Sequence, residues 1–84
     1  MNDYRLLADE IIYIMETKYK FDLVDGYTSE GFTDTVYDLI FVNNDNMEVK
    51  LTAIPFVDIL WTDKRAKQLE SFCRSEIEQV LFTE

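Results

Sequence analysis

The sequence predicts an α+β domain in which an antiparallel sheet of three or four consecutive strands carries an N-terminal and a C-terminal helix on one face. Three observations predict this fold. Apolar residues recur with helical spacing near both ends of the chain, the segment between them has strand-like patterns, and 84 residues suffice for one domain. Residues 1–84 are therefore expected to form a single α+β domain.

The first predicted element is a helix from Tyr4 to about Tyr19, whose start Asn2 or Asp3 is suited to cap. At about 100° per residue, its apolar side chains fall on one arc and its charged side chains fall opposite. The apolar arc comprises Tyr4, Leu7, Ala8, Ile11, Ile12, Ile14, Met15 and Tyr19. This spacing predicts an amphipathic helix that packs on a sheet.

The next segment predicts a short strand, a loop and a longer strand. Phe21–Asp25 is apolar enough for a brief strand, and Gly26–Asp34 reads as a loop because it contains both glycines of the chain. Thr35–Val42 predicts a strand, since seven of its eight residues are β-branched, aromatic or Leu. Because both of its faces are apolar, we expect this strand to be central.

A hairpin follows. Asn43–Asn46 favours a turn, and Met47–Ile54 alternates apolar and polar residues as a half-exposed strand does. Pro55 lacks the chemistry of a tight turn and predicts a bulge or bend that leads into a further strand within Phe56–Trp61.

The last predicted element is a helix that Thr62 caps and that runs to about Phe82. Its first turns are basic, whereas the helix dipole favours acids there. These bases are Lys64, Arg65 and Lys67. Two explanations remain open: the bases pair with acids such as Asp58 or Asp63, or they contact a partner.

Charge is the strongest global signal. Seventeen acids against eight bases give a net charge of −9, which opposes direct binding to nucleic acid and to an anionic membrane. Between Phe21 and Val49 there are seven acids and no base. The seven are Asp22, Asp25, Glu30, Asp34, Asp38, Asp45 and Glu48. Such an uneven charge indicates a basic partner, or it serves solubility alone.

Few residues are able to carry chemistry. The chain has no His, and Cys73 lies on the apolar stripe of the second predicted helix, so it is interpreted as a core residue. Asp38 and Asp58 interrupt apolar strands; they either point to an open sheet face, pair with Lys50, Lys64 or Arg65, or form an acidic stripe. The spacing of the loop acids does not match a calcium site. We expect no catalytic residue, metal or cofactor.

Leu6 and Tyr13 stand out in the first predicted helix. They are seven residues apart, which places both on its polar face among carboxylates. An aromatic residue and a leucine with an acidic rim are typical of an interface anchor. The alternative is that part of the sheet or a second copy of the chain covers them.

In size, acidity and lack of catalytic groups, the chain resembles small phage or mobile-element inhibitors of nucleic-acid enzymes, such as anti-restriction proteins, anti-CRISPR proteins and uracil-DNA glycosylase inhibitors. This likeness is one of composition. It implies an inhibitor that imitates DNA and occupies the basic nucleic-acid-binding surface of a partner protein. A cytoplasmic location is expected separately, from the lack of a signal-peptide pattern and from the single cysteine. The alternative is an accessory protein-interaction domain, monomeric or homodimeric, whose acidity serves only solubility.

Overall fold

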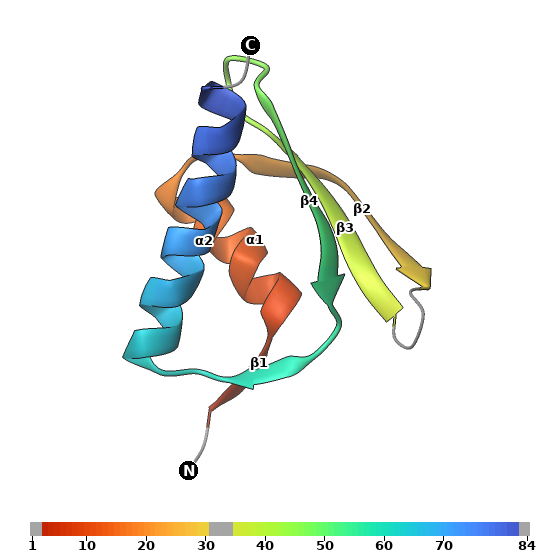
Figure 1. Ribbon diagram of the computed structural model, residues 1–84, viewed down its shortest axis with the longest axis vertical. Helices are drawn as coiled ribbons and strands as arrows, with labels where there is room; N and C mark the ends of the chain where they lie inside the picture. The colour runs from red at the N-terminus through yellow and green to blue at the C-terminus, as the bar shows by residue number, and fades with distance from the viewer. Residues whose placement is uncertain (1–2, 31–34, 83–84) are drawn as a thin grey trace.

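The computed structural model describes residues 3–30 and 35–82. Its elements are, in chain order, β1 (Tyr4–Leu6), α1 (Leu7–Lys18), β2 (Asp22–Glu30), β3 (Thr35–Val42), β4 (Glu48–Pro55), β5 (Asp58–Leu60) and α2 (Asp63–Leu81). Strands β2, β3 and β4 form an antiparallel sheet in that order, and β1 and β5 form a separate two-stranded sheet. Both helices lie on one face of the larger sheet (Figure 1), which confirms the predicted α+β fold.

Helix α1 begins at Leu7, so the predicted start at Tyr4 is wrong. Residues 4–6 pair as a strand with β5, and the first helical N–H, that of Leu7, donates to the Val57 carbonyl at 2.9 Å. Periodicity within one segment carries no information about a strand partner so far along the chain. The predicted apolar arc is confirmed where the helix does form, since Ala8, Ile11, Ile14 and Met15 are buried.

Strand β2 extends to Glu30, so the predicted loop is wrong over residues 26–30. Gly26 pairs with Leu39 of β3 and has no positive φ. A Cβ atom at Gly26 would lie 3.3 Å from Leu39 Cδ2, which shows that this glycine makes room for a core leucine rather than for a turn. The other glycine lies outside the described residues.

The β3–β4 hairpin is confirmed, and β3 has the predicted bounds. In its turn the Asn46 N–H donates to the Asn43 carbonyl at 3.1 Å. The Asn43 Oδ1 accepts from the N–H groups of Asp45 and Met47, each at 2.9 Å, and Asn46 has a φ of 61°. These bonds show that Asn43 organises the turn through its side chain.

The bend near Pro55 is also confirmed, but the strand beyond it does not join the larger sheet. The register of β3 and β4 shifts between Tyr37 and Leu39, opposite Ala53, whose φ is 58°. The chain then turns away, and β5 pairs with β1 instead.

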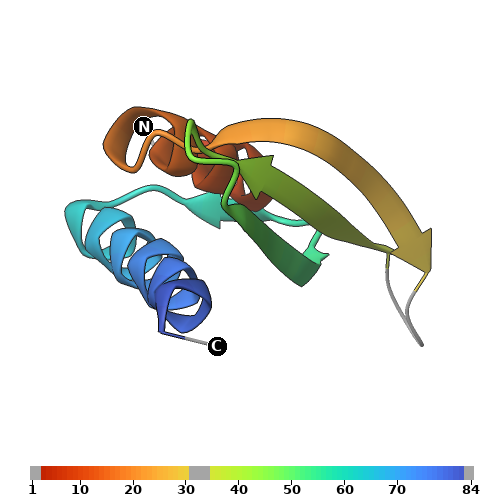
Figure 2. The same cartoon turned by 90° about the horizontal axis from the view of Figure 1, so that it is seen from above.

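Helix α2 has the predicted N-cap, because the Arg65 N–H donates to Thr62 Oγ1 at 3.1 Å. Figure 2 shows α2 on the same side of the sheet as α1, and its buried residues Leu69, Cys73 and Ile77 belong to the common core. An ion pair of 3.1 Å between Lys18 and Glu70, and a bond from the Tyr19 hydroxyl to the Glu70 carbonyl, join the two helices. Within the described residues, neither helix is long and apolar enough to cross a membrane.

The core lies between the helices and the inner face of the larger sheet. Phe41 is fully buried at its centre. The buried apolar residues are Ala8, Ile11, Ile14, Met15, Phe21, Leu39, Phe41, Val49, Leu51, Ile54, Leu69, Cys73 and Ile77.

Candidate binding surface

The side of the larger sheet that faces away from the helices carries most of the acids predicted to bind a partner. In β3, Leu39 and Phe41 point into the core, and Val49 and Leu51 do so in β4. Because successive side chains in a strand point to opposite faces, the residues between them face outward. We define the outer sheet face as Asp22, Asp25 and Tyr27 of β2, Asp38, Ile40 and Val42 of β3, and Glu48 and Lys50 of β4.

The register groups these outward residues into rows across the three strands. One row holds Val42 between Asp22 and Glu48. Neighbouring strands are about 4.8 Å apart, so the backbones of the two acids lie about 10 Å from each other, with a half-buried valine between them. This row has an acidic rim and an apolar middle.

A second row holds Ile40 between Asp25 of β2 and Lys50 of β4. Ile40 is half-buried, whereas both charged residues are exposed. The ion pairs within the described residues join Arg5 to Asp3 and Glu10, and Lys18 to Glu70. Lys50 therefore lies on the outer sheet face without a direct ion pair to an acid there.

Asp38 differs from the other acids of this face because it has a structural partner. Its Oδ1 accepts a hydrogen bond of 2.9 Å from the Ala53 N–H. Ala53 lies in the bulge of β4 in a left-handed conformation, where the regular hydrogen bonds between β3 and β4 are interrupted. The Asp38 carboxylate therefore provides an acceptor for the Ala53 N–H. The partner of Asp38 is thus the backbone and not one of the basic side chains considered from the sequence.

The remaining predicted acids are only partly placed. Asp45 is exposed in the turn that joins β3 to β4. Of Glu30 only the backbone, which pairs with Thr35, is described, and Asp34 lies outside the described residues. Asp58 is exposed in β5 opposite Leu6, away from the larger sheet.

Leu6 and Tyr13 do not share a helix as predicted. Leu6 ends β1, where it is half-buried opposite Asp58, and α1 starts one residue later. Tyr13 is 62% exposed on α1. Tyr27, by contrast, is an exposed aromatic residue on the outer sheet face, opposite Asp38.

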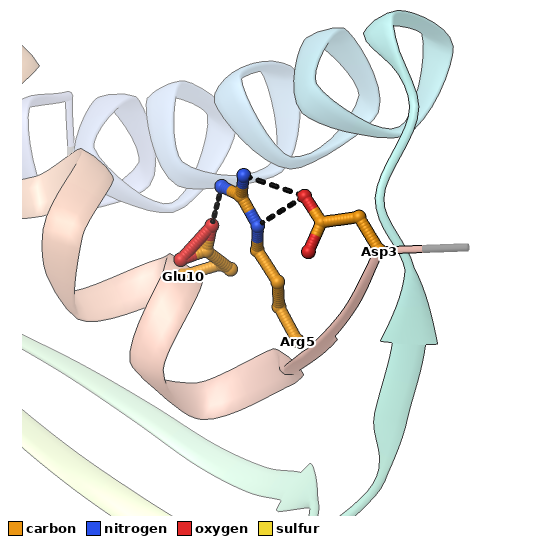
Figure 3. A network of polar contacts seen from close by, with 3 residues as sticks. All are labelled: Asp3, Arg5 and Glu10. Atoms are coloured by element: carbon orange, nitrogen blue, oxygen red, sulfur yellow. Dashed lines mark hydrogen bonds and ion pairs between the residues drawn. The ribbon is translucent and has the colours of Figure 1, made fainter. Parts of the chain in front are cut away.

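Arg5 organises a polar network that the sequence does not reveal (Figure 3). Its guanidinium donates to Asp3 Oδ2 at 2.7 and 3.0 Å and to Glu10 Oε1 at 2.8 Å, and it lies 4.9 Å from the centre of the Trp61 ring. The hydrogen bonds that Arg5 donates to Asp3 and, second, to Glu10 raise the pKa of Arg5 further above its usual value. Asp3 directly precedes β1, Glu10 lies in α1 and Trp61 precedes α2, so the three meet only because the chain folds back to this place.

Cys73 is buried in α2, as its place on the apolar stripe predicts. Burial raises the pKa of the thiol to about 12, and the nearby charges of Glu76 and Glu70 add to this effect. The side chain is therefore a neutral thiol at physiological pH, not a thiolate nucleophile. Among the described residues, no three His, Cys, Asp or Glu side chains gather closely enough to hold a metal ion.

Comparison of the chain with protein-family models, with curated proteins and with solved structures found no match. No relative therefore assigns a role to the outer sheet face or to any other residue described above. The functional assignment rests on the chemistry of these surfaces.

Proposed function

We propose that this chain is a small non-catalytic binding protein whose outer sheet face docks on a basic surface of a partner protein. The observation that carries this proposal is the pair of cross-strand rows. Exposed Asp22 and Glu48 flank half-buried Val42 in one row, and in the other row half-buried Ile40 lies between exposed Asp25 and Lys50. Apolar residues surrounded by a charged rim are the usual composition of a protein interface.

The two kinds of residue have different tasks in such a complex. Asp22, Asp25 and Glu48 attract a basic partner over a distance and orient it, which raises the association rate. Val42, Ile40 and the exposed Tyr27 supply apolar area that loses water on contact. The complex is therefore expected to weaken with salt without being abolished by it.

In its specific form, the proposal is that the partner is a nucleic-acid-binding protein and that the chain inhibits it as a DNA mimic. A protein that binds nucleic acid presents Lys and Arg to phosphates, and carboxylates at the same places compete for those cations. The net charge of −9, concentrated in the segment that forms the outer sheet face, supports this form.

A non-catalytic role accords with the residues present. The chain has no His, which is the commonest general base. Its cysteine is buried as a neutral thiol, and Asp38, the acid that interrupts the central strand, holds a backbone N–H.

The test compares two variants of equal net charge. Each neutralises three exposed acids and changes the net charge from −9 to −6. The sheet variant is Asp22→Asn/Asp25→Asn/Glu48→Gln, and the control on the helices is Asp9→Asn/Glu16→Gln/Glu78→Gln. Both are immobilised, exposed to a bacterial lysate at low and high salt, and then eluted with sheared duplex DNA.

We expect wild type and the helix control to retain nucleic-acid-binding proteins that DNA and high salt release, and the sheet variant to lose them. Equal capture by both variants would show that net charge, not the outer sheet face, is responsible. Capture that DNA does not compete would exclude DNA mimicry while leaving a basic protein partner.

A second candidate is an interaction domain that forms a homodimer. The favouring observation is that Tyr13 and Phe82 are 62% and 80% exposed in the single chain, so a second copy would bury apolar area there. Sedimentation at high protein concentration and physiological salt tests it, and a monomer under those conditions contradicts it. Net charge opposes self-association, so the first candidate is preferred.

A further inference from the structure

A second surface lies on the helical side of the molecule. A pocket of about 280 Å³ opens between α2 and the end of β4 and reaches the start of α1. We define the α2–β4 groove by the residues that line this pocket: Leu7, Ile11, Thr52, Ala53, Ile54, Pro55, Leu69 and Phe72.

The size and lining of the groove indicate what it accepts. Pockets for cofactors and drug-sized ligands occupy about 300–1,000 Å³ and contain several convergent polar groups. The α2–β4 groove is smaller, and seven of its eight lining residues are apolar, with Thr52 as the polar exception. A groove of this kind suits one or two apolar side chains of a peptide.

One wall of the groove is a sheet edge. Strand β4 pairs with β3 on one side, and no strand within residues 3–30 and 35–82 pairs with its other side. That free side faces α2 in Figure 1. The pairing of β4 is regular over residues 48–51, the bulge that contains Ala53 interrupts it, and the strand ends at Pro55. Unpaired backbone groups on an edge favour an added extended segment, and here they lead into the pocket.

The start of α2 gives the groove a charge. Lys64, Arg65 and Lys67 are exposed and take part in none of the ion pairs within the described residues, so the expected pairing with Asp58 or Asp63 does not occur. Arg65 precedes Leu69 by one helical turn and Phe72 by two, which places it on the groove side of α2. The groove therefore has a basic end, in contrast to the rest of this acidic chain.

From these features we propose that the α2–β4 groove binds a short extended peptide that carries apolar residues at alternate positions and an acidic residue beside them. The peptide backbone pairs with the free edge of β4, its apolar side chains enter the pocket, and its carboxylate lies near Arg65. This site is separate from the outer sheet face and does not depend on the function proposed for that face.

The probe is a displayed library of random short linear peptides, sorted on the full chain. Two charge reversals on α2 form a matched pair: Arg65→Glu on the groove side, and Arg74→Glu, nine residues later and about 180° around the helix. Arg65→Glu also places an acid in the first turn of α2, where the dipole favours it, so folding is retained.

We expect the enriched peptides to share apolar residues at i and i+2 together with Asp or Glu. Arg65→Glu should bind them about fivefold more weakly, and Arg74→Glu and the outer-sheet variant should bind them as wild type does. Amide NMR shifts on binding should move along β4 and over the first half of α2.

Three results of the selection would overturn the proposal: no enriched peptide family, a basic consensus, or apolar residues at i, i+3 and i+4. The last pattern would indicate a helical occupant. NMR shifts confined to the outer sheet face would also overturn it. A failure of this experiment leaves the lysate result for the outer sheet face unaffected, because the two surfaces are altered by different substitutions.

Discussion

The outer sheet face and the α2–β4 groove differ in charge and in shape, although β4 takes part in both. The outer face presents exposed Asp22, Asp25 and Glu48 around half-buried apolar residues. The groove is apolar, and Arg65 lies one helical turn before Leu69, which lines it. This contrast is the reason why we propose partners of opposite charge for two surfaces of one domain of 84 residues.

The largest expected effect comes from the core that holds the sheet and the helices together. Phe41 is fully buried there, and its replacement by Ala should cost about 3–5 kcal/mol of unfolding free energy. Such a loss is comparable with the whole stability of a small domain. Urea unfolding followed by circular dichroism measures it.

Val42→Ala is the matched control for this prediction, since Val42 neighbours Phe41 but points outward and is only half-buried. Its cost should be about 1 kcal/mol. Equal costs for the two substitutions would contradict the assignment of inner and outer faces.

An intermediate effect tests whether the two surfaces are coupled. Asp38 lies on the outer sheet face, yet its hydrogen bond holds Ala53, which lines the groove. Asp38→Ala should lower the unfolding free energy by about 1 kcal/mol. Asp38→Asn retains an acceptor oxygen and should lower it less. If both variants are as stable as wild type, this bond does not maintain the bulge.

A smaller effect on stability is expected at Ala53, which lines the groove. Ala53 has a φ of 58°, where a residue with a Cβ atom is disfavoured by roughly 1–2 kcal/mol. Glycine removes that strain but loses about 0.5–1 kcal/mol more conformational freedom on folding. Ala53→Gly should therefore stabilise the chain by about 0.5 kcal/mol in thermal unfolding. A clear loss of stability would show that the alanine methyl group packs usefully in the groove.

The smallest effect at neutral pH is expected at Cys73, which lies in α2 on the core side. Its thiol pKa of about 12, raised from 9.0, means that the folded chain keeps a proton that the unfolded chain loses. Stability should therefore be unaffected below pH 9 and should fall as pH rises from 9 toward 12. Urea titrations of wild type and Cys73→Ala measure this, and an identical decline in both would assign the effect to other groups.

Much of the fold follows from local patterns. The β3–β4 hairpin, its Asn43 turn and the Thr62 cap of α2 are predictable because each depends on residues close together in sequence. Gly26 shows the limit of such reasoning, since it resembles a loop residue but lies in β2 opposite Leu39. Only the pairing with β3 reveals that a side chain at this position would lie close to Leu39.

The candidate surfaces likewise have some features that the sequence predicts and others that only the fold reveals. The acidity of residues 21–49 is evident from the sequence, and the alternation of β4 predicts an exposed face. The bond between Asp38 and Ala53 and the Arg5 network join residues that are distant in sequence or lie in different elements. The α2–β4 groove likewise combines residues of α1, β4 and α2, and no single segment predicts it.

The sequence by itself determined the two helices, the central hairpin, the core position of Cys73 and the concentration of negative charge, because periodicity, capping and composition act over neighbouring residues. Only the tertiary structure decided that residues 4–6 and 58–60 form a second sheet and that β2 continues past Gly26. It also decided which acids share a face and where a groove remains open. The physical reason is that strand pairing and side-chain packing join segments far apart in the chain, and their partners are chosen by the assembled fold.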